Sequence, residues 1–284
     1  MASNYTAPPP AYRDDPQNKL SSVPPEDEAA RPLLSPTAGP SAGGFYDQPA
    51  EGDLPDDFKY GTCVADSAPE IRNAFVRKVY SILFVQILAT SIVAGIISQS
   101  DSALTWIIMN TWSVWVSMIG TFVCLGVLYW KRHSYPTNFI FLSLFTVLEA
   151  FSLGLIVAFY RNVIVLQALL ITLGVFLGLT LFTFQSKYDF SGMGPWLFGG
   201  LVALVMTGFV GMIIPFGQTM DLLYAIGGTL LFSGYIVYDT YTINKRLSPD
   251  EYIMASISLY LDFINLFINI LRLLNNAQDR DDDQ

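Results

Sequence analysis

Three acidic residues, Glu149, Asp239 and Asp262, lie within stretches of sequence that are otherwise apolar enough to cross a membrane. A carboxylate at the centre of a bilayer-spanning helix costs roughly 2.5 to 3.5 kcal/mol on insertion scales, so it normally faces a partner, a water-filled cavity or an ion path. Asp262 is the clearest case, because it stands in the middle of the apolar run 259–271. We therefore expect the functional site to be built on these three acids.

Polar residues recur every three or four positions around Asp262, a spacing that places them on one face of a helix. This polar stripe consists of Ser258, Asp262, Asn265, Asn269 and Arg272. Apolar side chains cover the rest of the helix. The pattern predicts a last helix with one face turned away from lipid.

Asp239 and Asp262 are expected at similar depths in two consecutive helices. The sequence Ser-Pro-Asp-Glu at 248–251 provides an N-cap, a first-turn proline and a capping-box acid, so the last helix should begin at Pro249. At 1.5 Å per residue, Asp262 then lies about 20 Å from that start, and Asp239 lies about 12 Å from the end of the preceding helix near Leu247. Helix tilt can absorb the difference, so the two carboxyl groups can meet.

Two carboxyl groups at close range do not ionise together easily, so such a pair shares one proton and responds to pH as a unit. Carboxylate and amide oxygens are also ligands that Ca²⁺ accepts, and Glu149, Asn265 and Asn269 can add oxygens to a transient site at Asp239 and Asp262. The alternative is a purely structural role, in which hydroxyl and amide groups of neighbouring helices satisfy these acids. Lys131 and Arg132, in a short loop, are either membrane-surface anchors or a latch that neutralises the pair.

The composition indicates a membrane protein, with 52% hydrophobic and 14% charged residues over 284 positions. The net charge of -9 comes largely from the two ends of the chain and is not the charge of a nucleic-acid-binding protein. Two cysteines, Cys63 and Cys124, and one histidine, His133, provide neither a disulfide framework nor a His-based zinc site. We expect no cofactor and no resident metal.

Seven apolar stretches are each long enough to cross a hydrocarbon core of about 30 Å. They lie near 79–98, 106–130, 137–159, 162–184, 196–214, 222–243 and 252–274. Only helices satisfy the backbone of such stretches in lipid, since alternating barrel strands are absent from the sequence. The predicted fold is an all-α membrane protein: a seven-transmembrane-helix bundle at 69–275, a disordered, proline-rich acidic tail at 1–68, and an acidic tail at 276–284.

The amino-terminal tail carries the sequence Pro9-Pro10-Ala11-Tyr12, which matches the PPxY pattern that WW domains bind. It lacks the basic-then-apolar start of a cleavable signal peptide, so the first hydrophobic helix should serve as an uncleaved anchor. Basic residues favour one side of the predicted bundle and place the amino terminus in the cytosol. The carboxyl terminus lies on the opposite side if the seventh segment crosses, and in the cytosol if that segment returns.

The motifs Gly234-Tyr-Ile-Val-Tyr-Asp239-Thr and Leu259-Tyr-Leu-Asp262-Phe-Ile-Asn-Leu-Phe, followed by Ile270-Leu-Arg-Leu-Leu, resemble the signature of the transmembrane Bax-inhibitor-motif family. The start of the membrane half and the PPxY tail resemble fungal members. The resemblance covers nearly the whole membrane half.

The resemblance implies a seven-helix bundle that leaks Ca²⁺ from an intracellular store, gated by a pH-sensing pair at Asp239 and Asp262. It also implies roles in calcium homeostasis, the unfolded-protein response and suppression of cell death. In some members an arginine binds the pair as a latch, and the matching position here is Lys131, with Arg132 beside it. A lysine ammonium cannot hydrogen-bond two carboxylates with the two-pronged geometry of an arginine guanidinium, so the latch at Lys131 would bind the pair differently. Entry at the endoplasmic reticulum is expected, and a WW-domain ubiquitin ligase bound to the tail would direct onward transport to the vacuole, with the Golgi as a further location.

Three other functions compete with the channel. An intramembrane aspartyl protease is disfavoured, because no Gly-x-Gly-Asp accompanies the acid at Asp262, and we expect no enzyme activity. A proton-coupled transporter suits the acids, although no Gly/Pro-interrupted helix pair marks a substrate site. A non-conducting scaffold that binds cell-death or ubiquitin-ligase partners is the third.

Overall fold

The computed structural model describes residues 63–282, leaving aside the side chains of Asp66 and 279–282, and the PPxY motif at 9–12 lies outside this part. Its elements in chain order are η2 (Val64–Asp66), α2 (Pro69–Gln99), α3 (Asp101–Met109), α4 (Trp112–Lys131), α5 (Thr137–Val157), α6 (Asn162–Gln185), η3 (Ser191–Met193), α7 (Gly194–Ile213), α8 (Gln218–Lys245), η4 (Pro249–Glu251) and α9 (Tyr252–Asp282). All are helical, and seven are long and apolar enough to cross a membrane. The predicted fold class is confirmed for the described chain.

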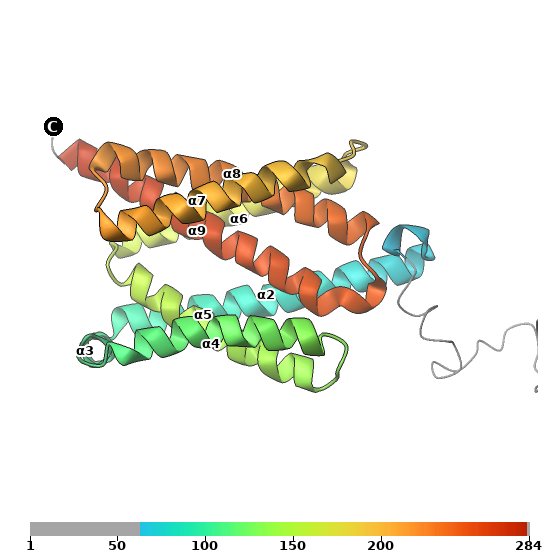
Figure 1. The fold of residues 1–284 in the computed structure, drawn as a ribbon, viewed down its shortest axis with the longest axis horizontal. Coiled ribbons are helices and arrows are strands. Elements are labelled where there is room, and N and C mark those ends of the chain that lie inside the picture. The colour runs from blue at the N-terminus through green and yellow to red at the C-terminus, as the bar shows by residue number, and fades with distance from the viewer. Residues whose placement is uncertain (1–62, 283–284) are drawn as a thin grey trace, which may run out of the picture. The chain divides into compact units, whose positions relative to one another are not determined.

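The first two spans differ in detail from the expected stretches. Helix α2 begins at Pro69 rather than near residue 79, because its polar first turns are helical although they are too charged to lie in hydrocarbon. The second stretch is divided into α3 and α4 at Asn110, where the backbone leaves the helical conformation (φ -116°, ψ 58°) and ends α3. Figure 1 shows α3 end-on while the other helices run across the view, so α3 lies crosswise to the bundle.

Helix α9 is the central element of the bundle. It packs against α8, α6 and α2, and most of its side chains are buried. It is also one continuous helix from Tyr252, so the seventh segment does not turn back on itself. The predicted start is present as η4, where the Ser248 amide donates to Glu251 Oε2 at 3.5 Å.

The remaining spans form two groups on either side of α9 (Figure 1). Helices α2, α4 and α5 pack together in one group, and α6, α7 and α8 pack together in the other. Because α9 contacts members of both groups, it joins them through the middle of the bundle.

Large apolar side chains cover the outside of the bundle, as a lipid-facing surface requires. Helix α7 is the extreme case: Trp196 is 85% exposed, and of its residues only Leu197 is buried. The protein is therefore an integral membrane protein, and α7 is its most lipid-exposed span.

Short element η2 lies inside the segment assigned by sequence to the amino-terminal tail. Val64 is fully buried, and its amide donates to the carbonyl oxygen of Leu247 at 2.9 Å. The apolar Val64 side chain joins the hydrophobic core at the turn between α8 and η4. The chain is thus attached to the bundle before α2 begins.

Candidate functional site

The structure brings Asp239 and Asp262 together at the interface of α8 and α9. Their carboxyl groups lie close enough to interact directly, and the Ser258 hydroxyl lies near Asp239. Asp262 is only 6% exposed, and its Oδ2 has no partner among the described residues. Two carboxyl groups at this range can hydrogen-bond to each other only if one of them carries a proton.

The two helices meet along faces on which their sequences keep a polar or small residue at most turns. On α8 this face carries Asp221, Tyr224, Gly228, Tyr235 and Asp239, spaced by three, four or seven residues. On α9 it carries the polar stripe. A Cβ on Gly228 would overlap the side-chain amide of Asn269, so a glycine is needed where the stripe approaches the α8 backbone.

The two asparagines of the stripe are held by their own helix. Asn265 donates to the Leu261 carbonyl oxygen and Asn269 donates to the Asn265 carbonyl oxygen, each at 2.8 Å. The Oδ1 atom of Asn269 is buried and has no partner among the described residues. An unpaired buried oxygen is energetically costly.

A second polar cluster closes the other end of the stripe. Arg272 Nη1 lies 3.8 Å from Asp221 Oδ1, and Asn276 donates to Asp221 Oδ2 at 2.7 Å. The Arg272 guanidinium also lies 5.3 Å from the centre of the Tyr224 ring and is close to Tyr160, where burial raises the pKa of the Tyr160 hydroxyl. The sequence prediction included Arg272 but missed its partners; Asn276 could have been found, since it continues the stripe by four residues.

Glu149 lies apart from the pair. It is on α5, where its partner is Thr121 of α4, and Tyr260 lies near it. No group of three or more His, Cys, Asp or Glu side chains that could hold a metal ion occurs within residues 63–282. The expected oxygen contribution of Glu149 to a Ca²⁺ site at Asp239 and Asp262 is thus not assembled in this conformation.

The two candidate latch residues also face other partners. Arg132 Nη1 lies 3.2 Å from Glu251 Oε1, at the start of the last helix, and Arg132 Nε donates to His133 at 3.0 Å. The Lys131 ammonium lies 5.4 Å from the centre of the Trp130 ring. The described contacts therefore attach the α4–α5 loop to the end of the helix that carries Asp262, and not to the acid itself.

Hydroxyl and amide pairs between helices were not found by sequence reasoning, although they support the site. Tyr260 and Thr90 join α9 to α2 through a 2.8 Å hydrogen bond between their hydroxyls. Gln86 of α2 donates to Thr146 of α5 at 3.0 Å. These two bonds hold α2 against α9, the helix that carries Asp262, and against α5.

Comparison with known proteins completes the description. Residues 72–279 match the family model described as "Inhibitor of apoptosis-promoting Bax1". The chain is similar to Bax inhibitor 1 of Schizosaccharomyces pombe, at 44% identity over 90% of this chain and 96% of that protein. It is also similar to Protein lifeguard 4 of Mus musculus, at 42% identity over 78% of this chain and 92% of that protein, and to the Golgi anti-apoptotic protein of vaccinia virus, at 41% identity over 78% and 93%.

Proposed function

Because this chain belongs to the Bax inhibitor family of membrane proteins, we propose that it is a pH-sensitive channel through which Ca²⁺ leaks from an intracellular store. The observation that carries the proposal is the contact between Asp239 and Asp262 inside the bundle. Ionisable side chains inside a membrane-spanning helix are usually functional, and proton-controlled ion passage is a function that a pair of neighbouring carboxyl groups can serve.

The proton is the gating particle in this proposal. With one proton between them, Asp239 and Asp262 attract each other through a hydrogen bond and hold α8 against α9. Loss of that proton leaves two negative charges at contact distance in a medium of low dielectric constant, where repulsion is strong. The helices then separate, and the pair offers its oxygens to a divalent cation.

The proposed path follows the polar stripe between α8 and α9. It runs from Asp239 and Asp262 past the amides of Asn265 and Asn269 to the cluster at Arg272. The unpaired Oδ1 of Asn269 supports this route, because it leaves an acceptor inside the bundle at the midpoint of the path. Single carboxylates and amide oxygens bind weakly enough to let an ion leave again.

Cellular roles follow as part of the same proposal. The amino terminus is cytosolic and the protein resides in the endoplasmic reticulum, with vacuole or Golgi as later locations. A leak from the store lowers its Ca²⁺ content, which would link the channel to calcium homeostasis, the unfolded-protein response and cell-death suppression, the activity named for the viral relative. The PPxY motif at Pro9, Pro10 and Tyr12 would bind a WW-domain ubiquitin ligase.

Ca²⁺ efflux from proteoliposomes that hold the purified protein, measured between pH 6 and 8, tests the proposal. We expect a leak that depends on pH in the wild type and is flattened by Asp239→Asn or Asp262→Asn, because an amide cannot exchange the proton. Asp101→Asn removes an exposed carboxylate at the start of α3 and should change nothing. Absence of flux above empty vesicles at every pH would refute the channel.

The same variants separate the competing functions. A proton-coupled transporter would show proton uptake that follows a substrate gradient and is lost in the two asparagine variants, with no Ca²⁺ flux. A scaffold would tolerate both substitutions without loss of partner binding.

A further inference from the structure

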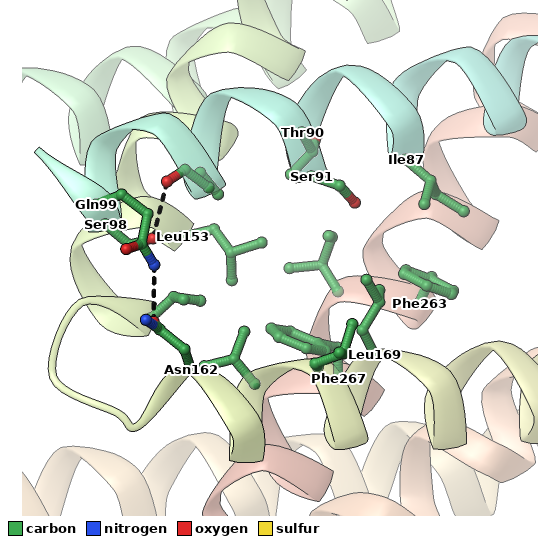
Figure 2. A pocket seen from close by; sticks show the side chains of 16 residues that line it. Ile87, Thr90, Ser91, Ser98, Gln99, Leu153, Asn162, Leu169, Phe263 and Phe267 are labelled. Carbon is green, nitrogen blue, oxygen red and sulfur yellow. Dashed lines mark hydrogen bonds between the residues drawn. The ribbon is translucent and has the colours of Figure 1, made fainter.

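A pocket opens between the two helix groups, at the seam where α2 faces α6. Its volume is about 220 Å³, and its floor is formed by α9 (Figure 2). Helices α2 and α6 are not in extensive contact with each other, and α9, with Leu153 and Val157 of α5, closes the space behind them. The pocket is therefore a gap in the wall of the bundle and not part of the Asp239–Asp262 site.

The deep part of this pocket is apolar. Phe263 and Phe267 of α9 and Leu153 of α5 line it and are almost fully buried. Two hydroxyl groups line this part: that of Thr90 is already engaged by Tyr260 at 2.8 Å, and that of Ser91 lies beside it on α2 (Figure 2). An apolar cavity of about 150 Å³ stays free of water and takes up a hydrocarbon guest, and this pocket is larger. It offers nothing that a cation would bind.

The shallow end of the pocket is polar and lies at the ends of the two helices. There the Gln99 side chain of α2 donates to the Asn162 side chain of α6 at 2.8 Å, and Ser98 lies beside them (Figure 2). Twelve residues separate Gln99 from Ile87 at the deep end, which corresponds to about 18 Å along the axis of α2. Between these ends the rim is open, since Leu166 is 58% exposed.

We propose that this pocket holds one acyl chain of a membrane phospholipid. Its polar end lies at the helix ends, where the ester and headgroup of a lipid lie, and its apolar end lies about 18 Å deeper in the hydrocarbon core. The open side of the pocket faces the bilayer, where phospholipid is always present at high concentration. A chain entering past Leu166 would place its methylene groups on Phe263 and Phe267, with its ester near Gln99 and Asn162.

Such a chain would separate α2 from α6 and bear directly on α9 beside Asp262. Burial of methylene groups from water is favourable, but a chain that comes from lipid gains only the packing contacts of a preformed, dry pocket. Binding is therefore expected to be selective and exchangeable. The inference does not depend on ion conduction.

Photolabelling tests the assignment. The full-length protein is placed in phosphatidylcholine nanodiscs that contain a small fraction of phosphatidylcholine with a diazirine near the end of one acyl chain, irradiated, digested and mapped by mass spectrometry. Label on Phe263 and Phe267 is expected, because bulk lipid cannot reach these buried side chains except through the pocket. Label confined to exposed residues such as Leu166 would overturn the proposal.

Gly95→Phe provides the matched variant. Gly95 lines the pocket and a Cβ there meets nothing within 4 Å, so a benzyl group at this position is expected to extend into the space that the acyl chain would occupy. Label on Phe263 and Phe267 should fall at least fivefold. Gly174→Phe, on an exposed part of α6 with equally open surroundings, should leave the label unchanged.

Two further outcomes are informative. Undiminished labelling in a correctly folded Gly95→Phe protein overturns the proposal, and Ser91→Phe, from the same wall, repeats the test if Gly95→Phe does not fold. A diazirine sterol that labels the two phenylalanines while the phosphatidylcholine probe does not would also overturn it, and would assign the pocket to a sterol.

Discussion

Replacing Gly228 with alanine is expected to destabilise the interface between α8 and α9. A Cβ at this position would overlap the side-chain amide of Asn269, and that amide is held in place by its hydrogen bond to the Asn265 carbonyl oxygen at 2.8 Å. Either the amide rotates and loses this bond, or the helices move apart along the polar stripe. Both responses affect the neighbourhood of Asp262.

Gly227 provides the reference for the magnitude. It is exposed and a Cβ there meets nothing within 4 Å, so Gly227→Ala reports the gain in helix propensity alone, up to about 1 kcal/mol. Gly228→Ala has the same gain and an overpacking cost of about 1 to 3 kcal/mol. The difference between the two variants should therefore be about 1 to 3 kcal/mol, or roughly 2 to 12 °C in Tm for a domain of this size.

Thermal unfolding in detergent, followed by intrinsic tryptophan fluorescence, measures that difference. The double variant Gly228→Ala with Asn269→Ala should recover most of the loss relative to Asn269→Ala alone, because the side chain that the new methyl group meets has been removed. Equal Tm values for Gly227→Ala and Gly228→Ala would refute the close approach of α8 to Asn269.

Three other expectations concern contacts around the site. Thr90→Val should destabilise the protein by about 1 to 3 kcal/mol, because it leaves the buried Tyr260 hydroxyl without its partner. In the same thermal assay, the double variant Thr90→Val with Tyr260→Phe should lose less stability than the sum of the two single variants. The Arg132–Glu251 ion pair is about one-third exposed on its arginine side, so a double-mutant cycle with Arg132→Met and Glu251→Gln should give a coupling below about 1 kcal/mol that weakens further at 1 M salt. Asp189 lies in the loop after α6 and accepts hydrogen bonds from the Tyr241 hydroxyl of α8 and from the Ser191 backbone amide. These bonds, with that of Tyr241 the larger cause, lower the pKa of the Asp189 carboxyl to about 2. The stabilisation from these bonds is complete above the ordinary carboxyl pKa of 3.8 and is lost as the pH falls toward 2. Because Tyr241→Phe removes the stronger bond, it should raise the Asp189 pKa toward 3.8 in a carbon-13 NMR titration. An unchanged pKa would contradict the hydrogen bond.

Much of the architecture could be predicted from the sequence, because lipid leaves a spanning segment few choices. Runs of about 20 apolar residues must be helices, and the three- and four-residue spacing around Asp262 indicated which face of the last helix is polar. The start of that helix was also predictable, since the residues at 248–251 combine an N-cap with a first-turn proline. These signals are local, and each is contained within one element.

The features that the sequence left open depend on contacts between elements. Nothing local distinguishes Glu149 from Asp239, yet the packing of α4 on α5 gives Glu149 a threonine partner and places it apart from the pair. Composition does not separate helix α3 from the next span, because both are equally apolar, and the break lies in the non-helical backbone of Asn110. Likewise, the glycines at 174 and 178 fit a helix-packing motif by spacing, but both have open surroundings.

The central position of α9 also has a consequence for how the protein is made. Translation proceeds at about 5 to 20 residues per second, so roughly 7 to 30 s pass between synthesis of α4 and the appearance of the helix that joins the two groups. During that interval the seam that α9 later fills is exposed to lipid, or to any membrane chaperone that recognises it. A premature stop before Tyr252 would thus leave six inserted helices without a core, a species suited to rapid removal by membrane quality control.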